Sequence, residues 1–154
     1  MTEYMKLKKI LRRKGYIAIK LTRTVTNHFE LTASINGIKG RFILDTGASN
    51  SCVDFTDATF FNLQVKDSKT LASGAGATDM LTKQSLSNTI KIKQWKYANF
   101  NLVLFDLSHV NNALTQHNAN PVQGIIGADI LQKGKAIIDY SNNKLYLKRL
   151  IFKY

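Results

Sequence analysis

The chain contains a series of short segments in which apolar and polar residues alternate. Residues 17–21 show this period of two, and it returns over residues 29–35. Such alternation is typical of half-buried antiparallel strands. Asn36-Gly37 follows directly, and this dipeptide favours the type I′ turn of a two-residue hairpin. We therefore expect a hairpin whose second strand covers residues 39–44.

Further short elements follow along the chain. Asp54 precedes a segment that we expect to be helical over residues 55–63, because aspartate is a favoured N-cap. Short helices are also expected at 108–114 and 128–132. The other expected strands cover residues 70–75, 80–87, 89–95, 99–105, 124–126, 135–139 and 144–148. Many short strands with a few short helices predict an all-β domain, a compact barrel or sandwich.

The length of 154 residues and the hydrophobic share of 44% fit one domain with a packed core. We expect that domain at residues 15–154, after a leader at residues 1–14. No apolar run approaches the roughly 20 residues that span a bilayer, and the start lacks the apolar stretch of a secretory signal. A cytoplasmic location is the default expectation. One cysteine and three scattered histidines give no basis for a disulfide or a metal centre, and we expect no cofactor.

The net charge of +12 is concentrated at the two ends. Residues 1–41 carry +8, residues 42–130 carry −1 and residues 131–154 carry +5. Six of the basic residues lie between Lys6 and Lys14, without interleaved aromatic residues of the kind that stack on nucleic-acid bases. We expect a solvated leader outside the core. The alternative is a short basic amphipathic helix that touches anionic lipid or nucleic acid.

One segment points to catalytic chemistry. Three apolar residues, Phe42-Ile43-Leu44, lead directly into Asp45-Thr46-Gly47-Ala48-Ser49. A strand that leaves the core would thus deliver a carboxylate into a glycine-containing turn, where the charge must be paired, hydrogen-bonded or neutralised. An aspartate that merely caps a turn is the alternative interpretation.

This segment resembles the active-site loop of the retropepsins, the single-domain aspartic proteases of retroviruses and their bacterial relatives. The segment Gly124-Ile125-Ile126-Gly127-Ala128-Asp129-Ile130-Leu131 resembles the family's strand of two hydrophobic residues before a glycine, which is followed by a short helix. Ser73, Gly74, Ala75 and Gly76 stand where the family has its flap, the hairpin tip that closes over substrate. The resemblance extends from about residue 28 to residue 147 and is greatest to the bacterial members. It implies a closed retropepsin-like β barrel with one Asp-Thr-Gly loop per chain.

The resemblance also implies a mechanism. Hydrolysis of a peptide bond needs a base that activates water and an acid that protonates the carbonyl, and two carboxyls that share a proton supply both. Because the Asp-Thr-Gly motif occurs once, the chain has to form a homodimer to be a protease, with each copy contributing Asp45 to the catalytic dyad. By the resemblance, Thr46 braces the two loops, Gly47 leaves room for their contact, and Ser49 bonds at the loop base. The expected partners are a second copy and a polypeptide substrate, with no specific nucleic acid.

Two residues depart from the viral pattern. Ala128 follows Gly127 where viral enzymes have an arginine, and Ser49 stands where they have the acid that pairs with it. The viral ion pair is therefore missing. Cys52 is interpreted as a small buried hydrophobic residue. Two other functions stay open: an inactive retropepsin-like domain that binds peptide or protein, and a basic protein for nucleic acid or membrane surfaces in which the Asp45 loop is incidental.

Overall fold

The structure is a computed structural model that describes residues 1–74 and 77–151. The helical elements are α1 (Glu3–Arg13), the 3-10 turn η1 (Phe55–Asp57), α2 (Ser108–Gln116) and α3 (Ala128–Lys133). The strands are β1 (Tyr16–Lys20), β2 (Thr22–Arg23), β3 (Phe29–Ile35), β4 (Ile38–Leu44), β5 (Cys52–Asp54), β6 (Lys66–Gly74), β7 (Ala77–Ile92), β8 (Trp95–Phe105), β9 (Gly124–Ile126), β10 (Ile137–Asp139) and β11 (Lys144–Lys148). No helix in these described ranges is long and apolar enough to cross a membrane.

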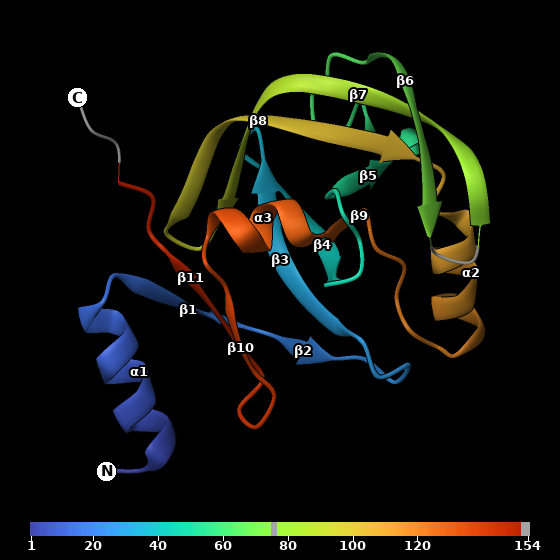
Figure 1. Cartoon of the computed structure of the whole chain (residues 1–154). Helices are drawn as coiled ribbons and strands as arrows, with labels where there is room; N and C mark the ends of the chain where they lie inside the picture. The colour runs from blue at the N-terminus through green and yellow to red at the C-terminus, as the bar shows by residue number, and fades with distance from the viewer. Residues whose placement is uncertain (75–76, 152–154) are drawn as a thin grey trace.

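Six strands close into a barrel, which confirms the predicted all-β fold class. The larger sheet has the order β2-β3-β4-β9-β5-β8-β7-β6, and β3 also pairs with β7. That pairing joins Ser34 to Lys91 and Ile35 to Ile90. It closes a ring of β3, β4, β9, β5, β8 and β7, with α3 packed across one side of it (Figure 1).

The β3–β4 hairpin forms as the alternation predicts. The apolar residues of β3 are buried and its polar residues face outward, from Phe29 through Ile35. Asn36 and Gly37 have φ values of 53° and 84°. Both central residues of a type I′ turn need positive φ, which asparagine and glycine adopt most readily.

Trp95 anchors the barrel core to the C-terminal hairpin. Its side chain is fully buried, and the indole Nε1–H donates to the carbonyl of Lys148 at 2.9 Å. Burial of an aromatic ring of this size adds strongly to stability when its polar N–H finds a partner. Strands β10 and β11 lie within the strands expected at 135–139 and 144–148 and pair antiparallel, and β1 completes a second sheet in the order β1-β11-β10.

Three predicted elements, one helix and two strands, differ from the structure. The helix expected over residues 55–63 is limited to η1, although Asp54 does cap it by accepting a hydrogen bond from the Thr56 amide at 3.0 Å. Asn62 has a φ of 54°, which no α-helix accommodates. The strands expected at 80–87 and 89–95 are largely one long strand, β7, with a register irregularity near Ser87.

The basic leader is helical and lies against the second sheet (Figure 1). Thr2 caps α1 by accepting a hydrogen bond from the Met5 amide. Leu11 is buried, whereas Leu7 and Ile10 remain 37% and 51% exposed. The structure therefore differs from a fully solvated leader at Leu11, because the amphipathic helix places that side chain against the fold.

Candidate active site

The Asp45 loop begins where β4 ends, beside the parallel strand β9. Leu44 aligns with Ile126, and the Asp45 amide donates to the Ile126 carbonyl at 2.9 Å. Strand β4 carries the buried residues Phe42, Ile43 and Leu44 up to this point. Asp45, Thr46 and Gly47 are then all exposed. The strand thus carries a carboxylate from the core to the surface of the single chain.

Asp45 is held by its own loop. The Gly47 amide donates to Asp45 Oδ1 at 2.9 Å, and the Ala48 amide donates to the Asp45 carbonyl at 3.2 Å. An aspartate commonly fixes a turn in this way. Among the described residues, no other side chain forms a hydrogen bond or ion pair with Asp45. The second carboxylate oxygen is therefore available to groups outside this chain.

Gly127 allows the Asp45 loop to pass close to the start of α3. The Ala128 amide donates to the Ala48 carbonyl at 2.7 Å. A Cβ atom on Gly127 would lie 2.6 Å from that same carbonyl oxygen and 3.1 Å from the backbone of Asn50. Only glycine permits this approach of two backbones. The structure thus places the Asp45 loop beside the Ile125-Ile126-Gly127 strand.

A polar network that the sequence did not predict ties the far end of the loop to α3. Asp129 Oδ1 accepts hydrogen bonds from the Ser51 hydroxyl at 2.6 Å and from the Ser51 amide at 2.9 Å. The Ser51 hydroxyl in turn accepts from the Gly127 amide at 2.8 Å. Ser51 is 1% exposed, so these bonds satisfy polar groups that would otherwise be costly to bury. The signal in the sequence was an acid two residues after Gly127.

The other predicted site residues are distributed as follows. Thr46 and Ser49 are exposed, and neither side chain has a hydrogen bond within the described part of the chain. Ser73 and Gly74 end β6, whose Gly74 pairs with Ala77 at the start of β7. Ala75 and Gly76 lie outside the described residues.

Cys52 is 1% exposed and packs with Leu107 and Ile125. Its burial raises the pKa of the thiol strongly. A thiol of this kind stays protonated and is a poor nucleophile, which agrees with its interpretation as a core residue. Within the ranges that the structure describes, no three His, Cys, Asp or Glu residues are grouped to hold a metal ion.

Comparison with known proteins gives both a family and a fold. The sequence model of the family described as aspartyl protease matches residues 31–130. A retropepsin-like aspartic protease from Rickettsia conorii is 21% identical, with a TM-score of 0.57, over 88% of this chain and 91% of that one. EIAV protease, solved with the inhibitor HBY-793, is 22% identical, with a TM-score of 0.56, over 77% and 98% of the two chains. The retroviral protease-like domain of Ddi1 from Leishmania major is 16% identical, with a TM-score of 0.53, over 79% and 88%. None of the curated proteins matches the chain significantly.

Proposed function

The chain belongs to the aspartyl protease family, and we propose that it is an aspartic endopeptidase that acts as a homodimer. In the proposed dimer each copy contributes one Asp45, and the two carboxyls meet at the two-fold axis. Carboxyls at such close range cannot both ionise, so the pair shares one proton and titrates in coupled steps.

The observation that carries this proposal is a single exposed carboxylate on an otherwise tightly held loop. The backbone around Asp45 is fixed by bonds to Ile126 and Ala128. The carboxylate itself has only the Gly47 amide as a partner within the described residues. General acid and base roles require two groups. A second copy of the same loop supplies the missing carboxyl.

The chemistry proposed for the dyad is a balanced proton transfer. The ionised Asp45 takes a proton from a water molecule as that water attacks the peptide carbonyl carbon. The protonated Asp45 of the other copy gives its proton to the carbonyl oxygen. The tetrahedral intermediate then breaks at the C–N bond: the Asp45 that took the proton from water gives it to the departing nitrogen, and one hydroxyl of the intermediate gives its proton to the other, now ionised, Asp45. The dyad thus ends with one shared proton, as it began.

The surroundings of the loop support a contact between copies. The Thr46 hydroxyl has no partner in the described chain, and we assign it to a hydrogen bond across the two-fold axis. Thr46 also lines a shallow hollow of about 360 Å³ with Leu131 and Ile138. Strand β10, which contains Ile138, is the open edge of the sheet β1-β11-β10. An unpaired edge offers backbone groups to a neighbouring chain.

Substrate access is assigned to the β6–β7 hairpin. Ser73, Gly74, Ala75 and Gly76 form the flap in this proposal, which rests on the family resemblance and on the pairing of β6 with β7 up to Gly74 and Ala77. Glycines permit the backbone changes that opening requires. Closure over an extended peptide would exclude water from the dyad.

Replacing Asp45 by asparagine tests the proposed function. An amide cannot act as the base or share the proton, yet its oxygen can still accept from the Gly47 amide. We expect Asp45→Asn to lower the rate of peptide cleavage by at least about a thousandfold, with an unchanged melting temperature. Cleavage is measured on a mixed library of fluorogenic peptides.

The matched control is Asp106→Asn, at an exposed aspartate that accepts from the Ser108 amide at the start of α2. It should cleave at the wild-type rate. Cleavage by Asp45→Asn at the wild-type rate would refute the role of Asp45. A wild-type dimer that binds peptides and cleaves none would show an inactive binding domain instead.

A further inference from the structure

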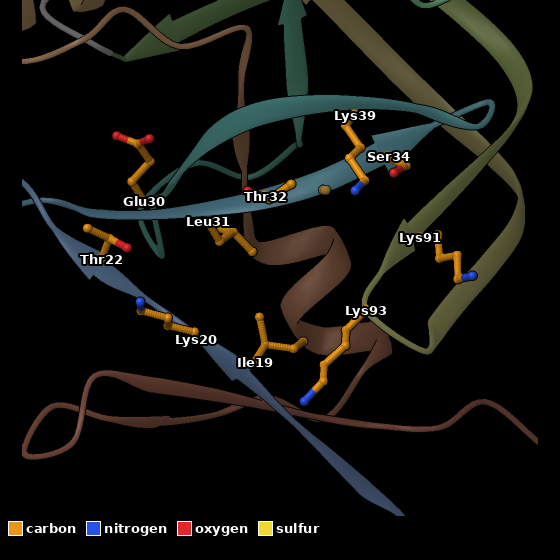
Figure 2. Close-up of a pocket in the computed structure, with 11 residues that line it drawn as sticks. Ile19, Lys20, Thr22, Glu30, Leu31, Thr32, Ser34, Lys39, Lys91 and Lys93 are labelled. Atoms are coloured by element: carbon orange, nitrogen blue, oxygen red, sulfur yellow. The ribbon is translucent and has the colours of Figure 1, made fainter.

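Two adjoining hollows on the outside of the barrel are lined by basic side chains. The first, about 550 Å³, lies between β1, β3 and the end of β7 (Figure 2). Lys20, Lys39, Lys91 and Lys93 line it, and all four are exposed. Glu30 is its acidic lining residue, and Arg41 Nε donates to the Glu30 carboxylate at 2.6 Å. The negative charge of this hollow is therefore already neutralised.

The second hollow continues the same basic surface toward the leader helix. It measures about 450 Å³, and its cationic lining residues are Lys8, Arg12, Lys93 and Arg149. Lys93 lines both hollows, and its Nζ donates to the Ala18 carbonyl at 3.0 Å. Among the described residues, none of these cations forms an ion pair. We call the two hollows together the basic groove.

The walls of the groove also present neutral donors. Thr22, Thr32 and Ser34 line the first hollow, and their hydroxyls have no partner in the described chain. Strand β3 pairs with β2 at one end and with β7 at the other, which leaves residues 31–33 unpaired on that edge. Lysine and arginine side chains, hydroxyls and backbone amides are the groups that contact phosphate oxygens in nucleic-acid complexes.

We propose that the basic groove binds the phosphodiester backbone of a single-stranded nucleic acid, independently of base sequence. The groove is recessed, which suits a strand more than the flat surface of a lipid bilayer. Its apolar lining residues, such as Ile19, Leu31 and Ala33, are buried, so it offers no exposed apolar pocket for peptide side chains. Two tyrosines line the second hollow: Tyr146 is buried, and Tyr16 is half-buried and donates its hydroxyl to the Lys135 carbonyl at 2.9 Å. The described lining therefore offers little aromatic surface on which bases would stack. The expected contact is thus electrostatic and does not depend on the proposed protease activity.

Fluorescence anisotropy with a labelled oligothymidylate tests the proposal on the full chain. If about five phosphates are neutralised, the logarithm of the binding constant should fall with the logarithm of salt concentration with a slope near −3.5. The variant K20E/K39E reverses the charge on two opposite walls of the groove. We expect it to weaken binding at least about tenfold and to flatten the salt slope by about 1.4.

The matched control is K66E/K83E, which changes the net charge equally on β6 and β7, outside the groove. It should weaken binding by less than about threefold, since only long-range attraction is altered. Melting curves establish that both variants fold. Equal weakening by the two variants, or no binding at about 50 mM salt, would overturn the proposal. So would tighter binding to phosphatidylserine vesicles or to polyglutamate than to the oligonucleotide, with the same dependence on Lys20 and Lys39.

Discussion

Gly127 fixes how closely the Asp45 loop can approach α3. A Cβ atom at this position would lie 2.6 Å from the Ala48 carbonyl oxygen, which is backbone and cannot rotate away. We expect Gly127→Ala to destabilise the fold by about 1–3 kcal/mol through overpacking. For a chain of this size, the melting temperature should fall by about 2–4 °C per kcal/mol.

Gly47→Ala is the comparison for that measurement. At Gly47 the nearest atom to a new Cβ is Asp45 Oδ1 at 3.3 Å, the end of a side chain. The stability of this variant should change much less than that of Gly127→Ala. Equal losses in thermal melts would show that the close approach at Gly127 does not control the packing.

At the scale of single residues, the Ser51–Asp129 network is the part of the site that could not be predicted from the sequence. The motif around Asp45 and the strand before Gly127 were both found from residue type and order. The sequence shows that the viral ion pair is missing, because Ala128 and Ser49 stand at its two positions. It does not show which contacts hold the loop in place of that pair. Asp129 lies in the motif over residues 124–131, but Ser51 is 78 residues away, and nothing in the sequence pairs the two side chains. Only the threading of β9 beside the loop brings them together.

Ser51→Ala should therefore weaken the loop. The change removes the hydroxyl that donates to Asp129 and accepts from the Gly127 amide. Leaving buried polar groups without partners costs about 1–3 kcal/mol, so chemical denaturation should show a loss of that size. Ser49→Ala, at an exposed serine in the same loop, should leave the free energy of unfolding within about 0.5 kcal/mol. A stable Ser51→Ala variant would contradict the assigned brace.

At the scale of elements, the expected β3–β4 hairpin forms, and the helices expected at 108–114 and 128–132 form as α2 and α3, whereas the helix expected over 55–63 does not. The β3–β4 hairpin formed as predicted because its periodicity and its Asn36-Gly37 turn favour the same structure. The segment over 55–63 has little intrinsic helical preference, with threonine at 56 and 59 and asparagine at 62. Asp54 correctly indicated where η1 begins, but a cap at the start of a helical segment does not indicate where the segment ends.

The charge of the leader does not determine whether it packs on the fold; its tertiary contacts do. The six basic residues between Lys6 and Lys14 indicated a solvated segment. In the structure, Leu11 is 6% exposed, and α1 contacts β1 at the edge of the second sheet. A short amphipathic helix is stabilised mainly by such packing.

Leu11→Ala tests whether α1 is part of the fold. Truncation of a buried leucine costs about 2–5 kcal/mol, and the melting temperature should fall accordingly. Ile10→Ala removes a neighbouring side chain that is 51% exposed, and it should change stability by less than about 0.5 kcal/mol. If both variants have the melting temperature of the wild type, α1 contributes nothing to stability and the leader is a solvated extension.

At the scale of the whole molecule, the barrel is complete in one chain and the proposed catalytic site is not. The β3–β7 pairing closes the ring of the larger sheet within one chain. The residues Asp45 to Gly47 nevertheless stay exposed at its surface. The core is thus closed within one chain, while Asp45 has no second carboxyl beside it. A symmetric dimer with a shared site requires both features.

Mixing wild-type chains with an excess of the Asp45→Asn variant tests this central claim most directly. The wild-type concentration is held constant, substrate is kept in excess, and the chains are allowed to exchange partners. If both Asp45 carboxyls are needed, a ninefold excess of the variant leaves about a tenth of the wild-type chains paired with one another. We predict that cleavage falls to about a tenth of its initial rate. A rate that stays constant as the variant is added would show that one Asp45 acts alone, and it would contradict the shared dyad.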